Sequence, residues 1–158
     1  MTRRTRKQRG GFSLLELVIV IVIVGIIAAI AIPRMSRGSA GAADSALTGD
    51  LAVMRNAIDL YAVEHGSTFP DVDDISDQFL QYTDAAGDAQ AAKDATHIYG
   101  PYLRKIPPLP VGAKKGKTGI DDATGDDVGW IYTEATGEIK SNTTDSEKDT
   151  SDVAYNTY

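Results

Sequence analysis

Residues 9–33 read RGGFSLLELVIVIVIVGIIAAIAIP and form the most apolar stretch of the 158-residue chain. Between Phe12 and Ile32, the polar side chains are those of Ser13 and Glu16. A helix of this length spans about 30 Å, which matches the hydrocarbon core of a bilayer. Because a segment in lipid must satisfy its own backbone hydrogen bonds, we predict a transmembrane helix over residues 12–33 despite its many β-branched residues.

The residues before this helix are basic, and the rest of the chain is acidic. Residues 1–11 contain no acid and five bases, namely Arg3, Arg4, Arg6, Lys7 and Arg9. Of the 16 basic residues, 11 therefore remain against 22 acidic ones, which gives the rest of the chain a net charge of −11. A basic N-terminus favours the cytoplasmic side of a membrane. The acidic remainder argues against nucleic acid as a partner.

Glu16 places a carboxylate near the start of the apolar helix, where a buried charge costs free energy. The sequence leaves three placements open. The side chain lies at the membrane interface, or it offsets the helix dipole in the first turn, or it pairs with a positive group of another copy. An ordinary cleaved secretory signal fits less well, because its apolar region is shorter than this one.

The N-terminal pattern resembles the class III signal of type IV pilins and type II secretion pseudopilins, above all that of a major pseudopilin. The shared features are a basic leader, Gly11, Phe12, Glu16 and an apolar run that ends at Pro33. The resemblance implies that a prepilin peptidase cuts between Gly11 and Phe12 and N-methylates Phe12. It also implies that Glu16 neutralises the new α-amine of a neighbouring subunit and fixes the register. A contact between Phe12 and Glu16 of one chain is the alternative.

The same resemblance implies where the protein acts and with what. It predicts a single-pass protein of the bacterial inner membrane, with a cytoplasmic N-terminus and a periplasmic head, which then enters a periplasmic filament. The expected partners are the prepilin peptidase, further copies of the chain, minor pseudopilins, the inner-membrane assembly platform and membrane lipid. The favoured function is a type II secretion pseudopilus for protein export. The alternatives are a type IV pilus subunit for adhesion, motility or DNA uptake, and a membrane-anchored binding module that does not polymerise.

A second helical pattern follows the membrane segment. Apolar residues recur there at spacings of three and four, at Leu47, Leu51, Met54, Ile58, Tyr61 and Ala62. Gly66 predicts the end of this helix, and Phe69-Pro70 follows it. We therefore predict an α+β fold, in which the second half of a long N-terminal helix packs against a small C-terminal head.

The head is predicted to contain one short helix and a β-hairpin. Residues 73–84, DDISDQFLQYTD, favour a short helix with Ile75, Phe79 and either Tyr82 or Leu80 inward. Residues 128–142, VGWIYTEATGEIKSN, alternate as strands do and predict a hairpin with Gly137 at positive φ. The predicted parts are a cleaved leader (1–11), a transmembrane or filament-core helix (12–33), the soluble half of the helix (34–66), a globular head with the hairpin (67–142) and a mobile polar tail (143–158).

The sequence offers no convincing catalytic set, and we expect no enzyme. It has no cysteine and two histidines, His65 and His97, which we interpret as surface or capping residues. Oxygen ligands suited to calcium cluster in the loop 111–127, at Asp121, Asp122, Asp126 and Asp127. Their spacing does not match an EF-hand, so we prefer a solvated charged loop without a cofactor, with calcium binding as the alternative.

Overall fold

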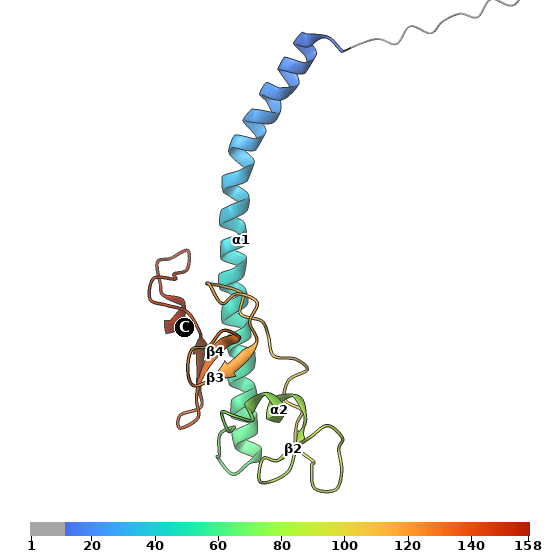
Figure 1. Ribbon diagram of the computed structural model, residues 1–158, viewed down its shortest axis with the longest axis vertical. Coiled ribbons are helices and arrows are strands. Elements are labelled where there is room, and N and C mark those ends of the chain that lie inside the picture. The colour runs from blue at the N-terminus through green and yellow to red at the C-terminus, as the bar shows by residue number, and fades with distance from the viewer. Residues whose placement is uncertain (1–11) are drawn as a thin grey trace, which may run out of the picture. The chain divides into compact units, whose positions relative to one another are not determined.

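The computed structural model describes residues 12–158, except for the side chains of residues 31–37. The predicted leader, residues 1–11, therefore lies outside the described residues. The chain is α+β, as predicted, with a long N-terminal helix, α1 (Leu14–Glu64), and a C-terminal head that contains small sheets (Figure 1). By its internal contacts it divides into two compact units, Met1–Gly38 and Ser39–Tyr158.

The second half of α1 carries the core face of the head. The predicted stripe is confirmed, because Leu47, Leu51, Met54, Ile58 and Tyr61 are all at most 3% exposed. Ala62 is half-buried, and Ala57 joins the buried face. The helix ends where expected. Gly66 has a φ of 66°, and the Ser67 N–H donates to the Ala62 carbonyl at 2.7 Å, which closes the last turn.

The predicted hairpin consists of β4 (Val128–Thr133) and β5 (Glu138–Ser141), which pair antiparallel. Gly137 lies in its turn with a φ of 69°, and a Cβ there would lie 2.6 Å from the Phe69 ring. A third strand, β3 (Gly119–Asp121), runs parallel to β4 and completes the sheet. The sequence did not indicate β3, because Ile120 is the one apolar residue of that strand.

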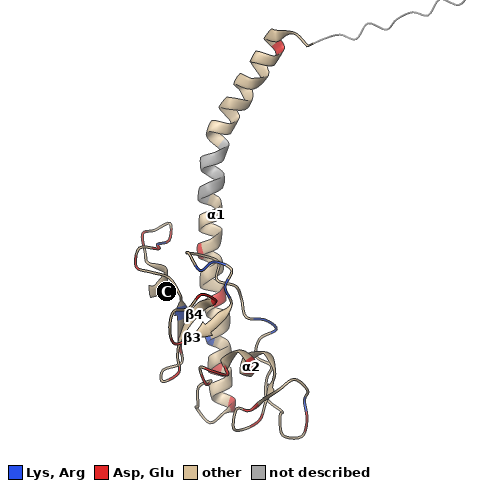
Figure 2. Cartoon of the chain, in the orientation of Figure 1, with Lys and Arg blue, Asp and Glu red and all other residues tan. Residues whose placement is uncertain are grey.

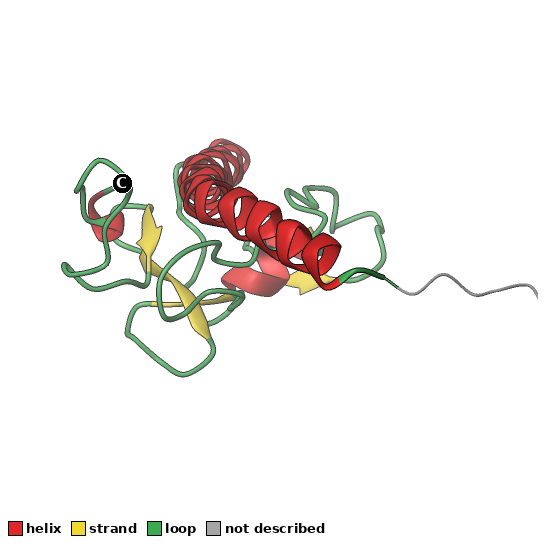
Figure 3. Cartoon of the chain, turned by 90° about the horizontal axis from the view of Figure 1, so that it is seen from above, coloured by secondary structure: helices red, strands yellow, loops and turns green. Residues whose placement is uncertain are grey.

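A short helix and a two-stranded sheet pack near the C-terminal end of α1. The predicted short helix is α2 (Ile75–Leu80), and both Ile75 and Phe79 are fully buried, as expected. It is followed by the antiparallel strands β1 (Tyr82–Thr83) and β2 (Ala89–Gln90). Seen from above, loops make up much of the head between these elements (Figure 3).

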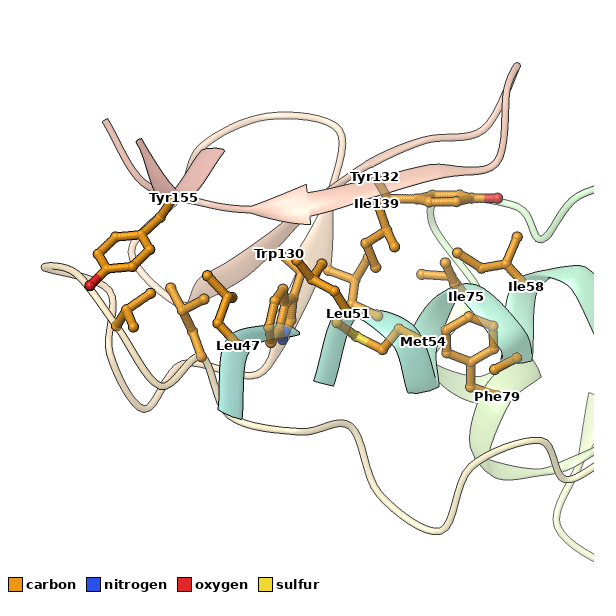
Figure 4. Packing of buried hydrophobic residues seen from close by; sticks show 14 residues of the cluster. Leu47, Leu51, Met54, Ile58, Ile75, Phe79, Trp130, Tyr132, Ile139 and Tyr155 are labelled. Atoms are coloured by element: carbon orange, nitrogen blue, oxygen red, sulfur yellow. The ribbon is translucent and has the colours of Figure 1, made fainter. Parts of the chain in front are cut away.

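The core of the head lies where α1, α2 and the three-stranded sheet meet (Figure 4). Trp130 and Tyr132 of β4 are fully buried against the α1 stripe. Their polar atoms have partners, since the Trp130 indole N–H donates to the Pro107 carbonyl at 2.8 Å and the Tyr132 hydroxyl donates to the Pro70 carbonyl at 3.0 Å. These bonds allow two large amphipathic side chains to enter an apolar core without leaving a polar atom unpaired.

The C-terminal segment, residues 143–158, for which the sequence predicts a mobile tail, packs on the head. Tyr155 is 9% exposed, lies in the 3₁₀ helix η1 (Tyr155–Thr157) and belongs to the core cluster. Its hydroxyl donates to Asp44 of α1 at 2.7 Å. Arg55 of α1 donates to the Tyr158 carbonyl at 2.7 Å. The buried tyrosine ring and these two hydrogen bonds attach the segment to α1, and the mobility of the segment stays a prediction.

Of the two placements predicted for His65, the structure supports capping rather than a surface position. The side chain is 8% exposed, and its ring stacks on that of Tyr61 with the centroids 3.9 Å apart. Its ring nitrogens lie 2.9 Å from the carbonyl oxygens of Tyr61 and Asp84. His65 thus joins the C-terminal end of α1 to the β1 region. His97 is held by Asp94, which accepts from its backbone N–H at 2.7 Å.

Candidate processing and assembly segment

The predicted cleavage point lies just before the first turn of α1. Gly11 is outside the described residues, whereas Phe12 and Ser13 are described and are not helical. The Phe12 side chain is 90% exposed, so none of the residues that the structure describes covers it. The helix begins at Leu14. The described side of the predicted scissile bond is therefore an exposed, non-helical pair of residues.

Ser13 and Glu16 cap the helix reciprocally. The Leu15 N–H donates to the Ser13 hydroxyl oxygen at 3.3 Å, and the Ser13 N–H donates to Glu16 Oε2 at 2.8 Å. Such a pair satisfies two backbone donors that a helix N-terminus otherwise leaves without partners. This arrangement agrees with the second of the three placements, in which Glu16 lies in the first turn and offsets the helix dipole.

Sequence reasoning missed the role of Ser13, although its signal was present. The spacing Ser-x-x-Glu ahead of an apolar run is the sequence pattern of a capping box. Within the described contacts, Glu16 is bonded to Ser13 rather than to Phe12. The pairing of Glu16 with another copy is not tested by a single chain and stays a prediction.

The helix that follows is apolar on every side. From Leu14 to Ile30 each large apolar side chain is exposed, with values from 40% for Val18 to 80% for Leu14. Figure 2 shows no charge along this part of α1 after its first turn, up to the residues drawn in grey. An amphipathic surface helix hides one apolar face, whereas a helix that is apolar all round requires lipid or protein around it.

Among the residues that the structure describes, no helix combines the length and hydrophobicity needed to cross a membrane. The transmembrane helix predicted for residues 12–33 is thus not confirmed. Its last residues, 31–33, are among those whose side chains lie outside the description.

Two of the four candidate calcium ligands have lysine partners instead. Asp127 Oδ1 lies 2.6 Å from Lys117 Nζ, and Asp126 Oδ1 lies 3.8 Å from Lys114 Nζ. The hydrogen bond from Lys117 lowers the pKa of the Asp127 carboxyl.

The other two candidate ligands interact with each other and with the backbone. A hydrogen bond with Asp121 raises the pKa of Asp122, and Asp121 Oδ1 accepts from the Ala123 N–H at 3.2 Å. Within residues 12–158, as far as they are described, no three acidic or histidine side chains gather so as to hold a metal ion. Calcium binding itself is not tested.

The comparisons with known proteins agree with the N-terminal pattern. Residues 6–32 match the family model of the prokaryotic N-terminal methylation motif, which bears out the resemblance to the class III signal. The match includes Gly11, Phe12, Ser13 and Glu16, and it supports a type IV pilin-like protein without distinguishing a pseudopilus from a pilus. No curated protein and no solved structure matches the chain.

Proposed function

We propose that this chain is a structural subunit that is cut between Gly11 and Phe12, N-methylated on Phe12 and assembled through its N-terminal helix into a type II secretion pseudopilus. The observation that carries the proposal is the methylation motif at residues 6–32, joined to a helix that is apolar on all sides. The motif supplies the processing signal. The exposed apolar helix supplies a surface that other subunits cover in a filament.

Before assembly, we place the apolar segment 12–33 in the bacterial inner membrane, with the head in the periplasm. The five basic residues of the leader support a cytoplasmic N-terminus, because such charges are retained on that side. Cleavage removes all five charges together with the leader. It also creates an α-amine on Phe12, close to the carboxylate of Glu16.

In the filament, Glu16 of one subunit is proposed to pair with the Phe12 α-amine of the next. A carboxylate buried among apolar helices without a cation is strongly destabilising, so subunits that bring the two groups together are favoured over other registers. The proposed partners are therefore the prepilin peptidase, further copies of the chain, minor pseudopilins and the inner-membrane assembly platform.

The head supports a pseudopilus over a type IV pilus. It has no cysteine, so it lacks a disulfide-closed C-terminal loop, and its small sheet is built on the Trp130 hairpin. The lysine partners of Asp126 and Asp127 support a head that folds without calcium. We propose no catalytic activity for it.

Deletion of the gene, followed by complementation with the wild-type chain, tests this function. A pseudopilus subunit is required for export of folded proteins across the outer membrane, whereas surface pili and twitching motility remain intact. Loss of pili with normal export would assign the chain to a type IV pilus. A chain that restores export but yields no crosslinked multimers in the membrane would identify a binding module that does not polymerise.

A further inference from the structure

His65, just beyond the end of α1, has a backbone carbonyl oxygen beside each of its two ring nitrogens. Nδ1 lies 2.9 Å from the Tyr61 carbonyl oxygen, and Nε2 lies 2.9 Å from the Asp84 carbonyl oxygen. A carbonyl oxygen can only accept a hydrogen bond, whereas a neutral imidazole has a single N–H to donate. Both contacts are therefore hydrogen bonds only when both nitrogens carry a proton, which makes the ring an imidazolium cation.

A chain of side-chain hydrogen bonds beside the ring gives the same result for Nε2. The chain ends at Glu64, whose carboxylate accepts from the Tyr102 hydroxyl at 2.7 Å. The Tyr102 oxygen is also hydrogen-bonded to the Thr83 hydroxyl. Because the Tyr102 proton points to Glu64, Thr83 is the donor in this second bond. Thr83 Oγ1, which lies 3.1 Å from Nε2, is then left as an acceptor toward the ring, so Nε2 donates.

This chain is buried and joins three segments of the head. Thr83 of β1 is fully buried, and His65 at the end of α1 is 8% exposed. Tyr102, in the third segment, has a raised pKa because burial and the bond to Glu64 both favour its neutral form. A positive charge on His65 suits its place at the C-terminal end of a helix, where the helix dipole favours cations. The carboxylate of Glu64 supplies the opposite charge at the other end of the chain.

The other ionisable groups near the ring are mostly acids and tyrosines. The Tyr61 ring stacks on His65, and burial, together with the charges of three acids, raises the pKa of its hydroxyl. His97 acts on one of these acids, Asp84, whose pKa is lowered first by the Ala86 N–H that it accepts. The groups that surround the ring are thus Tyr61 and Glu64 of α1, Asp71, Asp84, Asp88, His97, Tyr99 and Tyr102.

We propose that His65 is a protonation switch, whose imidazolium form holds the end of α1 to Thr83 and Asp84 and whose neutral form releases them. Nε2 is the nitrogen that gives its proton to water, because Thr83 can turn its hydroxyl toward Nε2, whereas Nδ1 faces only an acceptor. That turn takes the Thr83 proton away from Tyr102, and the bond from the ring to the Asp84 carbonyl is lost. The switch lies within the head and does not depend on the proposed filament function.

Nitrogen-15 NMR of the histidine rings, on the full chain in detergent micelles, tests the protonation directly. The chain has two histidines, so the spectrum of His97→Gln identifies the signals of His65. We expect protons on both ring nitrogens at about pH 5.5, and loss of the Nε2 proton alone as the pH rises past the ordinary histidine range near 6.5. A bare ring nitrogen in the folded chain at about pH 5.5 would overturn the proposal.

Glu64→Gln tests whether the carboxylate at the far end of the chain supports the charge on the ring. Glutamine still accepts from the Tyr102 hydroxyl but carries no charge. We expect His65 to bind its second proton about five-fold more weakly in this variant, from the loss of one opposite charge at the range of two intervening hydroxyls. Identical titration of the ring in the wild type and in Glu64→Gln would show that the hydrogen-bonded chain does not connect the two groups.

The effect on the fold is measured by urea unfolding, followed by the fluorescence of Trp130. A proton that the folded chain binds more firmly stabilises it below the ordinary histidine pKa of about 6.5, and this stabilisation is lost as the pH rises. Between about pH 5.5 and 8, we expect the folding equilibrium constant of the wild type to fall about ten-fold more than that of His65→Gln, since a hydrogen bond to a charged group is lost.

The matched control is His97→Gln, which should keep the pH dependence that His65 contributes. An unchanged pH dependence in His65→Gln would contradict the switch. If His65→Gln does not fold, the ring signals of the wild type decide the question by themselves.

Discussion

Replacing Tyr155 by Phe removes one hydroxyl and tests how the C-terminal segment is held on α1. The hydroxyl donates to Asp44 Oδ1 at 2.7 Å, and Asp44 Oδ2 accepts the N–H and hydroxyl of Thr150 at 3.1 and 2.9 Å. A hydrogen bond to a charged group contributes about 1.5–3 kcal/mol, and partial exposure of Asp44 to water reduces this. We therefore expect Tyr155→Phe to lower the free energy of unfolding by about 1 kcal/mol, and Asp44→Ala by about 2 kcal/mol.

The assay is urea unfolding of the full chain in detergent, followed by the fluorescence of the single tryptophan, Trp130, which is fully buried in the head. The double variant gives the coupling between the two side chains, and we expect about 1 kcal/mol, since residues in one hydrogen-bond network couple. Additive effects of Tyr155→Phe and Asp44→Ala, with a coupling below about 0.3 kcal/mol, would refute the hydrogen-bonded attachment of the segment to α1.

Three further outcomes follow from the head. Burial raises the pKa of Asp44, but hydrogen bonds from Tyr155 and Thr150 outweigh it, so the folded-state pKa is lower than usual. The ionised Asp44 therefore stabilises the fold above the unfolded pKa of about 3.9, and this stabilisation is lost as the pH falls through the lower folded-state pKa. Asp44→Asn should remove this part of the acid dependence of the free energy of unfolding. Gly49 lies on an exposed part of α1 with free space for a Cβ, so Gly49→Ala should stabilise the protein by up to about 1 kcal/mol. Gly129→Ala should destabilise it by more than about 1 kcal/mol, because the added Cβ would collide with the Lys117 carbonyl. Equal effects of the two substitutions on the urea midpoint would contradict this packing. Chelation of calcium should leave the melting temperature of the head unchanged, and a rise of more than about 4 °C on adding calcium would show a cation site.

The parts of the fold that the sequence predicted are those with a strong local pattern. The stripe from Leu47 to Tyr61 follows the helical period, and Gly137 between alternating residues marks a hairpin turn. The parallel strand β3 gave no such signal, since its pairing with β4 depends on a distant segment and on one apolar residue, Ile120. The packing of Tyr155 was hidden for a similar reason, because its partner Asp44 lies 111 residues away.

The candidate site was predicted in its residues but not in its local geometry. Gly11 and Phe12 were assigned through the resemblance to the class III signal, whereas Glu16 stands out because a charge in an apolar helix is costly. Ser13 passed unnoticed, although Ser-x-x-Glu is a local pattern that a capping box explains. The partner of Glu16 in another copy lies outside any one chain, so neither the sequence nor the fold of a monomer determines it.

The central claim is that the chain is processed at the start of its apolar helix. Mass spectrometry of the N-terminal peptide, from protein extracted from membranes of cells that contain a prepilin peptidase, measures this directly. We predict a mature chain that begins with Phe12 and carries one additional methyl group on its α-amine, and an unprocessed chain when the peptidase gene is deleted. A chain that retains its leader in the presence of the peptidase would contradict the account.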